Sequence, residues 1–208
     1  RSVQEFVNNT RQRVIDIIQE HLIKSNPGHG IITDNKITRP SKTGLIWAIN
    51  PIDCPENFMH RLPFFGSCIA LLAQPTEEKD MKNYANSDIL AATFFDPIRD
   101  EMFWAEKNNN AFLNARKLML THINKSQRMK LHGNAQQEDE ISLITGRSKN
   151  ANRNFGSSVM HMAYLAAGRI NETHEKFDDI ANICTGKLLV QEAKGTISTK
   201  QDTIIATR

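Results

Sequence analysis

Residues 47–63 read Trp-Ala-Ile-Asn-Pro-Ile-Asp-Cys-Pro-Glu-Asn-Phe-Met-His-Arg-Leu-Pro and specify the fold more sharply than any other stretch. The apolar residues 45–49 predict a buried strand, which we expect Pro51 to end, because proline cannot donate a ladder hydrogen bond. A helix is expected after Asp53, because Asp is a common N-cap and Pro55 suits a first helical turn. The stretch therefore predicts a strand that carries polar side chains to the start of a helix.

Outward from this stretch, the chain mixes predicted strands and helices. Strands are predicted at 45–49, 65–72 and 89–95, with a hairpin formed by 101–105 and 111–113. Helices are predicted at 9–23, 157–168 and 183–193, where apolar residues recur at helical spacing or glycine ends the run. The segment 127–140 has little pattern and is predicted to be a loop. Without a βαβ repeat, this mixture predicts a layered α/β or α+β sandwich.

The length of 208 residues suits a single domain, 1–208, with two closely packed halves, 1–120 and 121–208. Apolar residues make up 39% and charged residues 24%, which is typical of a soluble globular protein. The net charge of +3 comes from basic residues interleaved with acids, which argues against a nucleic-acid surface. No apolar run approaches the roughly 18 residues of a membrane helix, so no membrane partner is expected.

Cysteine usage predicts the compartment. Cys54, Cys68 and Cys184 are widely spaced and odd in number, which favours reduced thiols over a disulfide framework. None lies in a cluster with zinc-ligand spacing. We therefore expect a cytoplasmic protein.

Four blocks, in order along the chain, carry a resemblance to a known family. Residues 47–63 resemble W-x-I-D-P-I-D-G-T-x-N-F-x-H-x-x-P, and residues 96–114 resemble D-P-x-x-D-E-x-F-x-A-x-x-G-x-G-A-F-L-N. Residues 156–168 resemble G-S-A-A-x-x-x-x-Y-x-A-A-G, and residues 186–195 resemble the end of W-D-x-A-A-G-x-L-L-V-x-E-A-G-G. These are motifs of the inositol monophosphatase family. The residues of the four blocks are most similar to those of its bacterial SuhB-type branch, the extragenic suppressor proteins.

The resemblance implies an αβαβα sandwich of the inositol-monophosphatase and fructose-bisphosphatase type, usually a homodimer. It also implies magnesium-dependent hydrolysis of a small phosphorylated metabolite of the inositol monophosphate class. Such hydrolysis uses Mg²⁺ to activate a water molecule and to neutralise the phosphoryl oxygens. Because magnesium prefers carboxylate oxygens, the family gathers acidic side chains at one end of its sheet.

Matching the motifs residue by residue places the implied metal site. The metal-binding positions are Asp34, Asn50, Ile52, Asp53 and Asn182, and the catalytic positions are Asp34 and Asp53. Two of the four carboxylates have become amides, which lowers the ligand charge from about −4 to about −2, and magnesium binds weakly without such charge. We therefore expect weak magnesium binding. The family's N-terminal D-x-V-T-x-x-D pattern is also changed, and its last Asp is replaced by Arg11.

Two alternatives to this assignment stay open. A shifted register would bring Asp178 or Asp179 to the position of Asn182. Asp53 could also serve only as a helix cap.

The implied substrate-binding positions are also altered. They are Cys54, Pro55, Gly156, Ser157, Ser158 and Glu175. Where the family has Gly-Thr at the start of a phosphate-binding helix, this chain has Cys54-Pro55, and proline lacks the N–H that would hold phosphate. For Glu175 the alternative is a solvated acid in a polar loop, and for the Gly-Ser-Ser segment it is close helix packing.

Three functions follow from these observations. The first is a working magnesium phosphomonoesterase. The second is a non-catalytic interaction protein, a pseudo-phosphatase that binds the transcription machinery as SuhB-type relatives do. The third is a module that binds a phosphorylated metabolite without turnover. The amide substitutions favour the second and third over the first.

Overall fold

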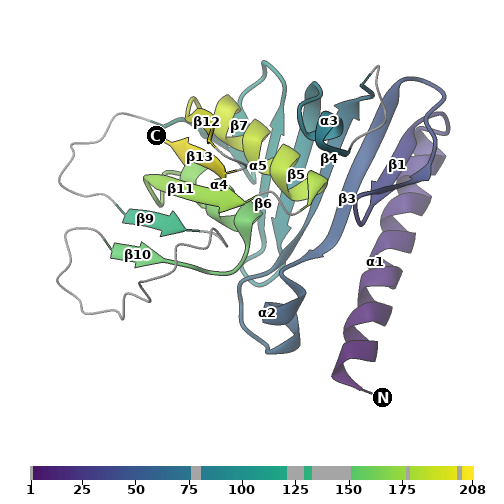
Figure 1. Cartoon of the computed structure of the whole chain (residues 1–208), viewed down its shortest axis with the longest axis horizontal. Coiled ribbons are helices and arrows are strands. Elements are labelled where there is room, and N and C mark those ends of the chain that lie inside the picture. The colour runs from purple at the N-terminus through teal and green to yellow at the C-terminus, as the bar shows by residue number, and fades with distance from the viewer. Residues whose placement is uncertain (1, 76–80, 121–128, 133–150, 177–178, 201–202) are drawn as a thin grey trace.

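The computed structural model describes residues 2–75, 81–120, 129–132, 151–176, 179–200 and 203–208. Figure 1 shows two β-sheets with helices between them and one long helix on the outside. The helices are α1 (Val3–Ser25), α2 (Pro55–Met59), α3 (Met81–Ala85), α4 (Ser158–Ala166) and α5 (Ile180–Glu192).

The larger sheet has eight strands in the order β2-β1-β3-β4-β5-β6-β7-β8. Its strands are β1 (Gly30–Thr33), β2 (Lys36–Arg39), β3 (Leu45–Asp53), β4 (Gly66–Ala73), β5 (Ile89–Asp96), β6 (Glu101–Glu106), β7 (Ala111–Leu113) and β8 (Arg116–Leu118). The β1 and β3 strands are parallel, and every other pair in this sheet is antiparallel. The carboxyl ends of β1 and β3 therefore lie side by side.

The smaller sheet has the order β10-β9-β11-β13-β12. Its strands are β9 (Met129–His132), β10 (Ala151–Arg153), β11 (Glu172–Lys176), β12 (Thr196–Lys200) and β13 (Thr203–Thr207). The β9 strand is parallel to both of its neighbours, whereas β13 is antiparallel to β11 and β12.

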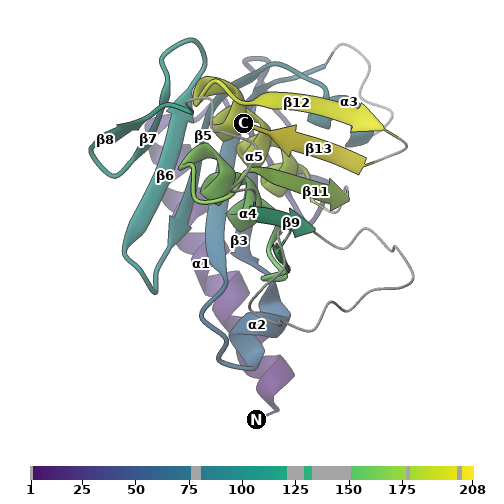
Figure 2. The same cartoon turned by 90° about the vertical axis from the view of Figure 1, so that its left-hand side faces the viewer.

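Helices and sheets alternate in layers. The α1 helix packs against β3, and Figure 2 shows it on the face of the larger sheet that is turned away from α4 and α5. The α4 and α5 helices pack on each other between the sheets, where α5 contacts strands β3 to β7 on one side and β12 on the other. The expected layered α+β fold is confirmed. Within the described ranges, no helix covers the outer face of the smaller sheet.

Burial explains the middle layer. All nine residues of α4 are buried, and α5 is buried along most of its length, because both helices are apolar nearly all round. Their side chains meet Ile46, Leu72, Phe94 and Phe103 of the larger sheet in one continuous core. By contrast, α1 fully buries only Val7 and Ile15, and its other residues are partly buried or exposed.

Three local predictions are wrong. The β3 strand does not end at Pro51 but continues to Asp53, with a register shift between Asn50 and Asp53 that accommodates the proline. The α1 helix begins at Val3, not at residue 9, because the Ser2 side chain caps it by accepting a hydrogen bond from the Glu5 N–H. The predicted loop 127–140 contains β9, and the rest of that segment lies outside the described residues.

None of the helices in the described part of the chain is long and apolar enough to span a bilayer.

Candidate functional site

The carboxyl end of β3 meets the N-termini of both middle helices. Asn50 and Asp53 lie in the last four residues of this strand. Asn182 lies in the first turn of α5, and Ser157 is the N-cap of α4. All four residues are at most 8% exposed. We call these four residues the amide cluster.

Hydrogen bonds join the amide cluster into a chain. The Asn50 Nδ2 donates to Asn182 Oδ1 at 3.0 Å, and Asn182 Nδ2 donates to Asp53 Oδ1 at 2.7 Å. The second oxygen, Asp53 Oδ2, accepts from the Ser157 hydroxyl. Both oxygens of this buried carboxylate therefore have protein donors, and the N-termini of α4 and α5 add favourable partial positive charge.

Asp53 does not cap the helix that follows it. The N-cap of α2 is Cys54, whose side chain makes no capping hydrogen bond, and the Asp53 carboxylate points instead to Asn182 and Ser157. The helix-cap interpretation of Asp53 is wrong because the carboxylate serves the amide cluster.

Asp34 lies beside the amide cluster, in the turn after β1. It is paired with Arg11 of α1, whose Nη2 donates to Asp34 Oδ1 at 2.6 Å. The same guanidinium donates through Nη1 to the Ile52 carbonyl oxygen at 3.1 Å. The parallel pairing of β1 and β3 brings Asp34 and Ile52 to the same end of the sheet.

The turn that carries Asp34 is a tight hairpin. Thr33 pairs with Lys36, and the two residues between them have φ angles of 49° for Asp34 and 55° for Asn35, as type I′ turns require. The Asn35 Oδ1 accepts from the Ile180 N–H at 2.9 Å, which ties the turn to the start of α5.

The sequence of nearly the whole chain matches an established family. The model for the inositol monophosphatase family matches residues 1–203. The chain belongs to the inositol monophosphatase family.

Similar proteins in this family carry two kinds of name. The chain is 30% identical over 206 residues to the Nus factor SuhB of Escherichia coli K12, with 93% of this chain and 72% of that protein covered. It is 26% identical to an inositol-1-monophosphatase of Caulobacter vibrioides, with 96% and 77% covered.

Solved structures of proteins with these names have the same fold. The extragenic suppressor protein SuhB of Bartonella henselae superposes with a TM-score of 0.79 at 25% identity, over 98% of this chain and 84% of that one. An inositol monophosphatase from Anabaena superposes with a TM-score of 0.78 at 20% identity, over 99% and 84%.

Within this family fold, the structure brings some of the predicted site residues together. Asn50, Asp53, Asn182 and Ser157 are in direct contact, and Asp34 and the Ile52 carbonyl share Arg11. The unshifted register is the one that reaches the amide cluster. Asp179 instead caps α5, accepting hydrogen bonds from the backbone of Ala181 and Asn182, while Asp178 lies outside the described residues.

The segment before α4 packs on the start of α2. Gly156 has a φ of +83°, and a Cβ there would lie 3.0 Å from Cys54 Sγ and 3.1 Å from Asn57 Nδ2. Pro55 occupies the first turn of α2, and Ser158 is buried in α4. Small residues are therefore needed here for close packing, which was the alternative interpretation of the Gly-Ser-Ser segment.

Glu175 belongs to a separate buried group. It lies fully buried on β11, so the solvated-loop interpretation is wrong. The Phe155 N–H donates to His161 Nε2 at 2.9 Å, which places the ring proton on Nδ1, and that nitrogen donates to Glu175 Oε1 at 2.8 Å. The Thr173 hydroxyl donates to the same oxygen, whereas Oε2 has no partner among the described residues. A ligand role for Glu175 stays a prediction.

Two residues that contact the site, Cys68 and Arg11, were not assigned a role from the sequence. Cys68 of β4 donates through Sγ to Asn182 Oδ1 at 3.1 Å, because it pairs with Asn50 across the sheet. Arg11 was noted only as a departure from the family pattern. Its helical position four residues after the buried Val7 signals that it faces the sheet.

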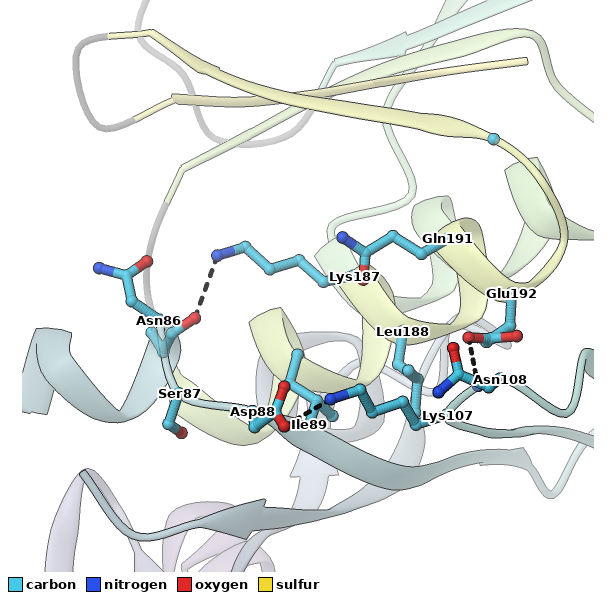
Figure 3. Close-up of a pocket in the computed structure, with 12 residues that line it drawn as sticks. Asn86, Ser87, Asp88, Ile89, Lys107, Asn108, Lys187, Leu188, Gln191 and Glu192 are labelled. Atoms are coloured by element: carbon cyan, nitrogen blue, oxygen red, sulfur yellow. Dashed lines mark hydrogen bonds and ion pairs between the residues drawn. The ribbon is translucent and has the colours of Figure 1, made fainter.

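A pocket lies elsewhere, at the C-terminal half of α5 (Figure 3). Its volume is about 570 Å³, and none of the predicted site residues lines it. Its polar groups largely satisfy one another. The Glu192 carboxylate accepts from the Asn108 and Asn110 N–H groups at 2.8 and 3.0 Å, Lys107 pairs with Asp88, and Lys187 donates to the Ala85 carbonyl at 3.1 Å. These bonds make the pocket wall a structural element.

Burial changes two ionisable groups on α5. It lowers the pKa of the half-buried Lys187 amine and raises the pKa of the Cys184 thiol to about 12. A thiol with so high a pKa carries almost no thiolate near neutral pH, so Cys184 is an inert core residue.

Proposed function

We propose that this chain is a non-catalytic member of the inositol monophosphatase family, whose role is to bind a partner and not to hydrolyse phosphate monoesters with magnesium. The observation that supports this is the continuous hydrogen-bond chain from Asn50 through Asn182 to Asp53. Three carboxylates in these positions would repel one another and would need cations between them. With two amides, an N–H donor faces an oxygen acceptor at both of these contacts without any ion, although Asn50 Oδ1 is buried with no hydrogen-bond partner among the described residues.

Most of the oxygens that magnesium would use at this site are already engaged by protein donors. The ion needs near-octahedral oxygen ligands, mostly carboxylates. Here both Asp53 oxygens and the Asn182 oxygen already accept hydrogen bonds, and Arg11 occupies one Asp34 oxygen and the Ile52 carbonyl. In the part of the chain that the structure describes, no group of three or more His, Cys, Asp or Glu side chains is arranged to hold a metal ion.

The phosphate-binding loop supports the same proposal. The family's phosphate-holding helix corresponds to α2, which has five residues and begins with Pro55, where no N–H is available. Glu56 adds a negative charge in the same first turn. Phosphate binding without turnover is therefore less well supported than binding of a macromolecular partner.

The partner we expect is the transcription machinery. The relatives named Nus factor SuhB support this expectation, since the one from Escherichia coli K12 is 30% identical over most of this chain. A homodimer and a cytoplasmic location remain predictions that follow from the family resemblance and the cysteine usage.

Hydrolysis assays test the proposal directly. The wild-type protein is incubated with inositol monophosphate or an aryl phosphate and millimolar Mg²⁺, with the Caulobacter vibrioides inositol-1-monophosphatase assayed in parallel. We expect magnesium affinity much weaker than micromolar by calorimetry, and phosphate release at the background rate. Turnover on the order of 1 s⁻¹ or faster, which is ordinary for enzymes, would show that the proposal is wrong.

A binding assay tests the positive half of the proposal. The tagged chain is expected to retain RNA polymerase-associated proteins from an extract of its own host, and an unrelated tagged protein serves as the control. Retention of none of these proteins would argue against a transcription partner.

A further inference from the structure

Arg11 joins two chain segments at the edge of the amide cluster. Its guanidinium donates at 2.6 Å to the Asp34 carboxylate in the turn after β1 and at 3.1 Å to the Ile52 carbonyl near the end of β3. The Arg11 side chain is only 21% exposed, although the Asp34 side chain is 64% exposed. The contact is therefore partly buried on the arginine side.

The two acceptors are of the kind that hard cations use. Carboxylate and main-chain carbonyl oxygens are common ligands of magnesium and calcium. A planar guanidinium can bond two such oxygens at once with its fork of N–H groups, which a compact ammonium does less well. Its single positive charge also lies against the formal negative charge of Asp34.

We propose that Arg11 is a built-in cation that takes the place of a divalent metal ion at the carboxyl ends of β1 and β3. It holds the two strand ends together and offsets the negative charge there, so this end of the sheet needs no metal ion. The inference rests on the proposed function, in which the protein holds no magnesium, and it names the residue responsible.

The exposure of Asp34 does not reduce the contact to an ordinary surface ion pair. Exposed pairs contribute little because water and salt screen them. The second bond of Arg11 goes to the carbonyl of Ile52, a residue that is 5% exposed. Removing Arg11 therefore deprives an oxygen inside the fold of its donor as well as ending the ion pair.

The test is the magnesium response of thermal unfolding. Wild-type protein and the Arg11→Ala variant are melted in EDTA and in increasing MgCl₂, and magnesium binding is measured by calorimetry. We expect the Tm of the wild type to be unaffected by MgCl₂. The Arg11→Ala variant should melt at lower temperature in EDTA, recover part of the loss in MgCl₂, and bind Mg²⁺ roughly tenfold more tightly, because a competing positive charge is gone.

Three further variants make the result specific. Arg13→Ala removes the same charge from an exposed position of α1 and should melt like the wild type at every magnesium concentration. Arg11→Lys keeps the charge but loses the fork, so it should lower the Tm in EDTA without gaining magnesium binding. If Arg11→Ala does not fold, Arg11→Gln keeps a donor for the Ile52 carbonyl and carries the same measurement.

The outcomes separate this inference from the proposed function. An Arg11→Ala or Arg11→Gln variant that is as indifferent to magnesium as the wild type and Arg13→Ala would overturn the inference alone. Magnesium-dependent phosphate release by the wild type would instead overturn the proposed function.

Discussion

At the residue scale, an amide differs from a carboxylate in having a donor. Asn182 uses both of its atoms, since Oδ1 accepts from Asn50 while Nδ2 donates to Asp53. An aspartate at position 182 would retain the first contact and turn the second into a repulsion between carboxylates. The amides therefore bond one another and Asp53 without cations, and this is why we expect weak magnesium binding.

The double substitution Asn50→Asp with Asn182→Asp tests this reasoning. We expect it to tighten magnesium binding by restoring two ligand charges, and to lower the free energy of unfolding in EDTA by about 3–5 kcal/mol, as when a buried charge loses its partner. Calorimetry and urea unfolding with and without Mg²⁺ measure the two effects. Unchanged stability in EDTA would mean that the hydrogen-bond chain contributes little.

The same double variant should regain little phosphatase activity. The start of α2 would still lack an N–H donor, and one lost donor to a developing oxyanion costs about 10²–10³ in rate. Adding Cys54→Gly, Pro55→Thr and Glu56→Thr should give a larger gain than the two aspartates gave. Steady-state assays on inositol monophosphate compare the variants, and no gain in the five-fold variant would place the limitation elsewhere in the chain.

At the element scale, the approach of α4 to the α2 loop depends on one glycine. Gly156→Ala should lower the free energy of unfolding by about 1–3 kcal/mol, because φ is positive and the new Cβ would press on Cys54 and Asn57. Gly44→Ala is a matched control, with a φ of +75° and open space around its Cβ. Equal losses in the two variants would contradict a packing role for Gly156.

A second contact between elements should depend on pH. Arg169, after α4, donates to both Glu101 oxygens on β6, and this hydrogen bond lowers the pKa of Glu101 from its ordinary 4.5. A carboxyl with a lowered folded-state pKa stabilises the fold above the unfolded pKa and loses that contribution as pH falls through the folded value. Glu101→Gln should thus cost about 1 kcal/mol or less at pH 7.

The pH series distinguishes this effect from a general loss of packing. The difference between wild type and Glu101→Gln in urea unfolding should shrink as pH falls below 4.5. A difference that stays constant with pH would show that the ionised carboxyl is not its source.

Sequence patterns predicted those elements whose burial is simple. The strands β4 and β5 and the helices α4 and α5 appear close to their predicted ranges, because apolar residues fill their buried positions. The family motifs also brought Asn50 and Asn182, which are far apart in the chain, to the same site, and the 3.0 Å hydrogen bond between them confirms that placement.

Other elements carry no such pattern. The β11 strand buries Thr173 and Glu175, so polar residues occupy the inward positions where alternation would require apolar ones. The β1–β2 hairpin has Asp34-Asn35 in place of a glycine-containing turn, a weaker signal for a type I′ turn. The contact of Arg11 with β1 and β3 depends on how α1 docks, which no local pattern specifies.

At the scale of the whole molecule, the two halves of the chain share one core. The α5 helix covers strands β3 to β7, so a fragment of residues 1–120 would expose the apolar face that contains Ile46, Leu72 and Phe94. We expect this fragment to bind a hydrophobic dye and to unfold without a cooperative transition, whereas the full chain unfolds cooperatively under the same conditions. Cooperative melting of the fragment would mean that the first half is an independent domain.

The bond between Asn50 and Asn182 spans 132 positions of the chain. Contacts of such long range form late in folding, because closing a large loop costs entropy before any contact can offset it. During synthesis, β1 and β3 leave the ribosome long before α5 has been made. The polar side chains at their carboxyl ends are therefore solvated by water until then. The hydrogen bonds of this site therefore cannot form until α5 has been made, and a chain stalled before residue 182 would lack both the partner of Asn50 and the helix that covers strands β3 to β7.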